Sequence, residues 1–342
     1  MTYTGFELTI YLEMNKVPIF IAEIAPQDLR GSLTTVSQLM ICFGSSTAYI
    51  VGAIVSWRAL VLLGVFPCIL LFLGLFFIPE SPRWLANDGK QKEFREALQQ
   101  LRGKGIDISV EASDIQENVD NLENHSNVGF WDIFEKKYYR PIGVGVGLMV
   151  FQQLSGCNGI GFYASQIFIS AGFSSGDIGT ILMGTIQVPI TMVGVILMDR
   201  CGRRSLLMVS ATGTFLGTFI AGLAFYLKEQ GLFLDRIPSL VLIGILVYMG
   251  FFSIGMGAIP WVIMSEIFPL NIKGIGGSLV TLVNWSGSWV VSYAFIFFLN
   301  WSSSGTFFIF SVASGVTVLF VNKFVPETKG RTLEEIQNSF NS

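Results

Sequence analysis

The chain has 342 residues, of which 51% are apolar and only 13% are charged, and its mean hydropathy is +0.60. Soluble domains carry about a quarter charged residues, so this composition excludes an ordinary soluble globular protein and indicates a protein of the lipid bilayer. The net charge of −3 comes without any run rich in Lys or Arg, which argues against a nucleic-acid partner. The four cysteines show neither metal nor disulfide spacing, and we expect no metal and no organic cofactor.

Eight windows of the sequence are long and apolar enough to cross a bilayer, which requires about 20 residues each. They lie at 33–54, 59–78, 142–168, 178–198, 205–227, 239–264, 275–299 and 306–322. A further apolar stretch at 17–22 is too short to cross alone. The sequence therefore predicts an all-α integral membrane protein with about eight full spans and one partial span.

The basic residues predict how these spans are oriented. If the long loop 79–141 lies in the cytosol, 17 of the 21 Lys and Arg residues fall on that side, together with the C-terminal tail. Basic residues are enriched in cytoplasmic loops, so this orientation is the expected one. The sequence fits either the vacuolar or the plasma membrane.

The loop 79–141 has its own helical pattern, with nine basic and twelve acidic residues. Amphipathic stretches occur at 90–101 (KQKEFREALQQL) and 130–139 (FWDIFEKKYY). The spacing of Phe94, Leu98 and Leu101 favours packed helices over a flexible linker. We expect a small group of surface helices on the cytosolic side.

The chain contains an internal repeat. EIAPQDLRGS at 23–32 resembles EIFPLNIKGI at 266–275 at an offset of 243 residues, and PES at 79 matches PET at 326 at an offset of 247. Two related halves, as in transporters built from repeats, are therefore predicted. The expected parts are an incomplete first membrane domain (1–78), the loop (79–140), a six-helix domain (141–325) and a tail (326–342). By this offset, three spans and most of a fourth of the first half are expected to be absent.

Polar side chains inside the span 142–168 mark the strongest candidate site. Polar groups in a span are unfavourable unless they face the interior of the bundle, so they indicate function. The amides are those of Gln152, Gln153 and Asn158. The glycines Gly156, Gly159 and Gly161 permit an interrupted helix. A continuous helix would place Gln152, Gly156, Gly159 and Tyr163 on one face. The alternative role of these amides is to hydrogen-bond neighbouring helices.

Five motifs give the sequence its resemblance to a known family: PESPRWL, QQLSGCNGIGFYA at 152–164, DRCGRR, IPWVIMSEIFP and PETKGRTLEE. Their order resembles that of the sugar porter family of the major facilitator superfamily, from about Lys16 to the C-terminus. FFIPESPRWLA, LRGKGIDIS and VGVGLMVFQQLSG are most similar to the plant early-responsive-to-dehydration branch of monosaccharide transporters. The resemblance implies a major facilitator bundle of twelve helices in two domains, which carries hexoses or pentoses by alternating access.

The resemblance also implies roles for individual residues. The implied sugar contacts are Gln152, Gln153, Asn158, Gln187, Trp261 and Asn284. Phe162 and Tyr163 match a pair of aromatic residues that occludes the outer side, and Trp285 is expected to form part of the wall. The chain departs from well-known members at Gln187, Ser253 and Ser288, which affects the choice of sugar more than the binding chemistry.

Acidic and basic residues gather at the helix ends that are expected to be cytosolic. Positive-inside anchoring accounts for the bases but not for the acids beside them, so we expect an ion-pair network that acts as a gate. The resemblance implies the same role. The residues are Glu23, Arg30, Glu80, Arg83, Asp199, Arg203, Arg204, Glu266, Lys273 and Glu327. Lys273 stands where arginine is common, and it lacks the bidentate fork of arginine.

Several classes of function compete with sugar transport. An enzyme is disfavoured because the sequence shows no metal cluster, nucleophile–base pair or phosphate loop, and a channel is disfavoured because it shows no filter or charge ring. A non-transporting or regulatory product of a sugar transporter gene is the main alternative, and we expect this chain alone to give little saturable uptake. Protons remain possible as a coupling ion. The identity of the sugar and the oligomeric state stay open.

Overall fold

The computed structural model describes residues 20, 24, 30–103, 105–125, 135, 138–268 and 272–329. Within these ranges the side chains of residues 30–35, 37, 118, 120–125, 199 and 273 are not described. All of the regular structure in the described ranges is helical. The chain divides into two compact units, residues 1–41 with 55–128 and residues 42–54 with 129–342.

The first unit combines membrane-type helices with a group of short polar ones. It holds the beginning of α2 (Arg30–Gly52), and then α3 (Trp57–Leu75), α4 (Pro82–Asn87), α5 (Gln91–Arg102) and α6 (Ser109–His125). Helix α3 is strongly apolar and has no buried residue, which suits a helix that faces lipid.

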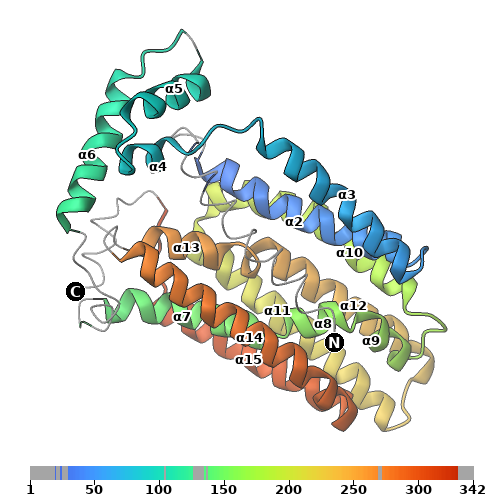
Figure 1. Ribbon diagram of the computed structural model, residues 1–342. Helices are drawn as coiled ribbons and strands as arrows, with labels where there is room; N and C mark the ends of the chain where they lie inside the picture. The colour runs from blue at the N-terminus through green and yellow to red at the C-terminus, as the bar shows by residue number, and fades with distance from the viewer. Residues whose placement is uncertain are drawn as a thin grey trace. The chain divides into compact units, whose positions relative to one another are not determined.

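Helices α4, α5 and α6 pack together around a small apolar core (Figure 1). Phe94 and Leu98 are each only 1% exposed, so the predicted packed helix at 90–101 is confirmed as α5. Arg102 at the end of α5 donates two hydrogen bonds to the carboxylate of Glu111 in α6, at 2.9 and 2.6 Å. The second predicted amphipathic stretch, 130–139, lies mostly outside the described residues.

The second unit is a bundle of long helices. Beyond the end of α2 it contains α7 (Tyr139–Leu154), α8 (Cys157–Phe162), α9 (Ala164–Ala171), α10 (Asp177–Cys201), α11 (Arg203–Glu229), η3 (Leu234–Arg236), α12 (Ile237–Phe251), η4 (Phe252–Met256), α13 (Ile259–Ile267), α14 (Lys273–Trp301) and α15 (Ser303–Phe324). Helix α11 packs along α12 and α15, and α14 packs along α7 (Figure 1).

Six helical segments of the described chain are long and apolar enough to cross a membrane: Trp57–Leu75, Asp177–Met198, Arg203–Glu229, Leu234–Ile267, Gly274–Trp301 and Ser303–Phe324. They match six of the eight predicted spans. The predicted span 33–54 is α2, whose apolar part is the shorter stretch Gln38–Gly52. The predicted span 142–168 is divided among α7, α8 and α9, because glycine interrupts the helix.

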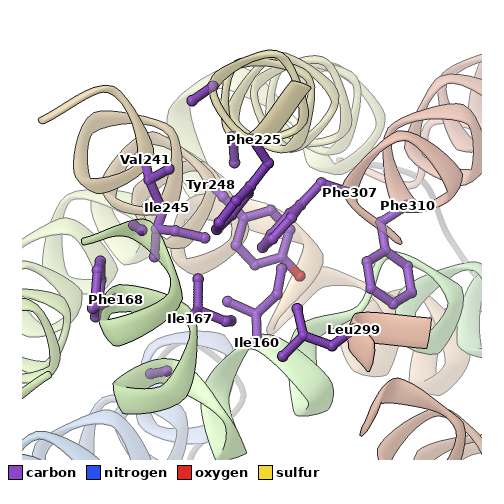
Figure 2. Packing of buried hydrophobic residues seen from close by; sticks show 14 of the residues in the cluster. Ile160, Ile167, Phe168, Phe225, Val241, Ile245, Tyr248, Leu299, Phe307 and Phe310 are labelled. Carbon is purple, nitrogen blue, oxygen red and sulfur yellow. The ribbon is translucent and has the colours of Figure 1, made fainter. Parts of the chain in front are cut away.

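Stacked rings and branched aliphatic side chains fill the core at one end of the bundle (Figure 2). The rings of Phe225 in α11 and Phe307 in α15 stack with centroids 5.4 Å apart. Tyr248 from α12 and Ile160 from α8 are completely buried beside them. This core holds the interrupted helix against α11, α12 and α15, and so fixes the position of the polar residues that precede it.

Candidate functional site

The interruption between α7 and α8 forms where the sequence places glycine. Gly156 has φ +87°, a conformation that other residues rarely adopt. A Cβ at Gly159 would stand 2.2 Å from the ring of Phe295, so only glycine fits there. The predicted interruption is confirmed. The expectation that Gln152 and Tyr163 share one helix face is wrong, because the break separates α7 from α8 between them.

Side-chain amides meet across this break in a hydrogen-bonded network. Gln153 at the end of α7 donates Nε2 to Oδ1 of Asn284 in α14 at 2.7 Å. Asn158 in α8 donates Nδ2 to Oε1 of Gln153 at 2.7 Å and to Oγ of Ser288 at 2.6 Å. Gln153 and Asn284 are 4% and 3% exposed. The structure thus brings together three predicted sugar-contact residues from three helices.

Gln152 points to a different helix from its neighbour. It donates Nε2 to the backbone carbonyl of Met256 at 2.6 Å and to that of Gly257 at 3.3 Å. These carbonyls lie where the helix α12–α13 is itself interrupted, by the turn η4 and the two residues after it. Two broken helices therefore meet at Gln152.

Aromatic rings line the far side of the interruption. Tyr163 lies between α8 and α9, and its ring stacks on that of Phe295 in α14, with centroids 5.4 Å apart and an interplanar angle of 12°. Phe295 in turn stacks on Phe310 in α15 at 5.8 Å. Phe162, the other predicted occluding residue, is half exposed. The pair is therefore divided between one partly buried ring and one exposed ring.

The two remaining predicted sugar contacts, Gln187 and Trp261, lie on helices outside the amide network, whereas Trp285, expected in the wall, shares α14 with Asn284. Gln187 in α10 donates Nε2 to Sγ of Cys42 at 3.6 Å, and its Oε1 is buried with no hydrogen-bond partner among the described residues. Trp261 in α13 is partly buried against an apolar cluster. Trp285 directly follows Asn284 in α14.

Two residues of α2 that the sequence did not single out contact the helices of the site. Ser46 donates to the carbonyl of Gly184 in α10 at 2.6 Å, and Tyr49 donates its hydroxyl to the carbonyl of Gly161 in α8 at 3.1 Å. A Cβ at Gly161 or Gly184 would stand 3.2 Å from Tyr49. The glycines signalled a close approach, but no sequence pattern identified the partner.

Four of the ten predicted gate residues lie in the second unit with described side chains, and Glu327 is the centre of the group. Glu327 accepts from the backbone N–H of Arg203 at 3.0 Å and of Arg204 at 3.1 Å, at the start of α11. It also accepts from the N–H groups of Thr328 and Lys329, each at 3.0 Å. Burial raises the pKa of Glu327, but these four donors outweigh it and lower the pKa below its ordinary value.

The guanidinium of Arg203 pairs with Glu266 in α13, with Nη2 and Oε1 3.2 Å apart. The guanidinium of Arg204 instead donates to the carbonyl of Asn322. The contacts within this group are thus of two kinds. Arg203 and Glu266 form an ion pair, whereas Glu327 caps a helix N-terminus, where backbone N–H groups lack partners within the helix.

The first-unit gate residues make fewer contacts. Glu80 accepts from the N–H of the adjacent Ser81 at 3.2 Å. Nε of Arg83 is buried and has no hydrogen-bond partner in the described part of the chain. Glu23 and the side chains of Arg30, Asp199 and Lys273 lie outside what the structure describes.

Comparison with known proteins agrees with this arrangement. Residues 8–340 match the family described as "Sugar (and other) transporter", which is nearly the whole chain. The chain belongs to the sugar transporter family. Its similarity to the Arabidopsis thaliana protein "Sugar transporter ERD6-like 16" is 56% identity over 335 residues, covering 98% of the chain and 69% of the relative. "Sugar transporter ERD6-like 7" from the same plant is 53% identical, with 94% of the chain and 69% of the relative covered.

Solved structures place the transporter in the major facilitator superfamily. The structure of the proton:xylose symporter XylE bound to 6-bromo-6-deoxy-D-glucose matches with a TM-score of 0.77 and 29% identity, over 94% of this chain and 70% of that one. XylE from E. coli in an inward-open conformation matches with a TM-score of 0.70, over 94% and 68%. These relatives are transporters, so the predictions of a helical major facilitator fold and of a protein that is not an enzyme are confirmed.

Proposed function

We propose that this chain binds a monosaccharide at the amide network and carries it across the membrane by alternating access. The observation that carries the proposal is the meeting of Gln153, Asn158 and Asn284 at an interrupted helix, with hydrogen bonds of 2.7 Å between the amides. A sugar presents many hydroxyls, each of which donates and accepts. Amide side chains both donate and accept hydrogen bonds, and they place no charge inside the bundle.

The surroundings of the network support the same ligand. Tyr163 stacks on Phe295, and such aromatic planes suit the apolar face of a sugar ring. Half-helices that end at the middle of the membrane are typical binding elements of transporters built from repeats. The relatives are described as sugar transporters, and one solved relative as a proton:xylose symporter. Hexoses and pentoses are therefore the first ligands to test.

We infer that the charged group around Glu327 closes the cytosolic side. Arg203, Glu266 and Glu327 join the start of α11, the end of α13 and the segment after α15, so separating these ends requires breaking their contacts. The bias of the basic residues supports a cytosolic location for the loop 79–141 and for the C-terminus. The proposal covers either the plasma membrane or the vacuolar membrane.

Uptake into proteoliposomes tests the function directly. The unmodified chain and Gln153→Ala would be compared for counterflow of D-glucose and D-xylose, with Ser278→Ala as the control. Ser278 is exposed in the same helix as Asn284, and its hydroxyl donates to the carbonyl of Gly274 in that helix. We expect counterflow that is weak but saturable from the unmodified chain and the control, in keeping with the little uptake expected from the sequence, and a loss of about 10-fold or more in Gln153→Ala, since buried amides would lose their partner.

Two outcomes would contradict the proposal: no counterflow by the unmodified chain, or equal counterflow by Gln153→Ala. Repeating the assay with an inward proton gradient separates the two possible mechanisms. A proton-coupled transporter would accumulate sugar against its gradient, and a facilitative one would only equilibrate it.

A further inference from the structure

The helix α12–α13 is interrupted by a π-helical turn that a single hydroxyl holds in place. Over Phe252–Met256 the backbone follows the wider pattern, in which the N–H of Gly257 donates to the carbonyl of Phe252 at 2.9 Å. Ser210 in α11 donates Oγ to the carbonyl of Phe251 at 2.6 Å and accepts from the N–H of Met256 at 2.8 Å. It therefore bonds to the backbone on both sides of the turn.

Ser210 reaches both groups because the two helices approach very closely. Ser210 is completely buried, and a Cβ at Gly255 would stand 2.6 Å from the Cβ of Ser210. Water cannot replace a hydroxyl in so close a contact. Without Ser210, the carbonyl of Phe251 and the N–H of Met256 would each lose the hydrogen bond to this buried hydroxyl. The hydroxyl thus favours the π-helical form of the turn over a continuous α-helix.

The same residue of the turn contacts the candidate site. The N–H of Met256 is bound by Ser210, and its carbonyl accepts from Nε2 of Gln152 at 2.6 Å. The contacts form one chain of hydrogen bonds that runs from the carbonyl of Phe251, through Ser210 and Met256, to Gln152. Hydrogen bonds in such a chain polarise and strengthen one another.

We propose that Ser210 is a positioning residue that couples the binding of a ligand at Gln152 to the conformation of the π-helical turn. The proposal rests on the proposed function, since it takes a monosaccharide as the ligand. With Nε2 held by Met256, Gln152 presents Oε1 to a sugar hydroxyl. Any change in the turn moves the carbonyl of Met256 and releases Gln152. Coupling is reciprocal, so a sugar that engages Gln152 also changes the stability of the turn.

Equilibrium binding to the purified full chain in lipid nanodiscs tests this coupling, with D-glucose and D-xylose as probes. The variants are Ser210→Ala, Gln152→Ala and the double variant. Ser314→Ala is the matched control, because Ser314 is equally buried and its hydroxyl has no hydrogen-bond partner among the described residues. We expect Ser210→Ala to weaken sugar binding about 5-fold and Ser314→Ala to change it less than 2-fold.

The double variant separates coupling from general damage to the fold. If Ser210 acts through Gln152, Ser210→Ala has less than a 2-fold further effect once Gln152 is alanine. Fold changes that multiply in the double variant, or equal effects of Ser210→Ala and Ser314→Ala, would overturn the proposal. Ser210→Cys, which keeps a weak donor and acceptor, should lie between serine and alanine, and it serves if the alanine variant does not fold.

Hydrogen–deuterium exchange of the segment 252–258 gives a second readout. Ser210→Ala should speed exchange at Met256 without sugar, and sugar should alter exchange there in the unmodified chain but not in Gln152→Ala. Sugar binding that leaves exchange at 252–258 unchanged would contradict the coupling alone. Absence of any sugar binding by the unmodified chain would contradict the proposed function as well.

Discussion

The two copies of the Pro-Glu-Ser/Thr motif make very different contacts, although their sequences are nearly the same. In the second copy, Glu327 accepts hydrogen bonds from four backbone N–H groups and holds the start of α11, which is 124 residues earlier in the chain. In the first, Glu80 accepts from the N–H of the next residue, Ser81. The two motifs, nearly identical in sequence, therefore differ in the reach of the contacts that the structure describes.

The largest test of this comparison removes the two carboxylates in turn. Glu327→Ala leaves four N–H donors without their acceptor, two of them at a helix start, and should lower the free energy of unfolding by about 2.5 kcal/mol. Glu80→Ala should lower it by less than about 0.5 kcal/mol, because within the described residues the hydrogen bond of Glu80 is to its neighbour Ser81. Unfolding in mixed micelles with increasing SDS measures both. Equal losses of unfolding free energy in the two variants would contradict the comparison, because they would show that Glu80 and Glu327 stabilise the fold to the same extent.

The glycines near the two motifs allow a second, smaller comparison. Gly202 has φ +85° and ψ 160°, and a Cβ there would stand 2.7 Å from Oε2 of Glu327. Gly89 has φ +74° and open space around it. Gly202→Ala should therefore cost about 2 kcal/mol of stability and Gly89→Ala about 1 kcal/mol. The same SDS titration measures both losses of unfolding free energy. A larger loss in Gly89→Ala than in Gly202→Ala would contradict the expected clash with Glu327.

The smallest expected effect is a dependence on pH. Because the pKa of Glu327 is lowered in the folded chain, its carboxylate adds stability above the ordinary value of 4.5, and this contribution is lost as the pH falls below it. The stability difference between the unmodified chain and Glu327→Gln should therefore shrink below pH 4.5. Thermal unfolding from pH 7 to about pH 3.5 measures this difference.

Much of the fold followed from the sequence, because the physical signals were local. Long apolar runs predicted the spans, and Gly156 and Gly159 predicted the broken helix, since only glycine fits its backbone or its neighbours. The polar residues Gln153 and Asn158 stood out because amides in a span require partners. These signals depend on one segment at a time.

Contacts between distant segments were harder to predict. Nothing in FSIGM at 252–256 indicates a π-helical turn, which depends on the hydroxyl of Ser210 from another helix. The sequence placed Glu327 in an ion-pair network without naming its partner. The structure gives it the backbone N–H groups of Arg203 and Arg204, because a helix start offers donors that no residue type reveals. Tyr49 was missed because its partner, the backbone carbonyl of Gly161, also lies on a distant segment of the chain.

A structure determined with a monosaccharide bound would test directly whether the sugar binds at the amide network. We expect sugar density within hydrogen-bond distance of Gln153, Asn158 and Asn284, beside the ring of Tyr163. Gln153 and Asn158 would then exchange part of their mutual contact for sugar hydroxyls. Sugar density elsewhere in the bundle, with the 2.7 Å contacts among these amides unchanged, would contradict it.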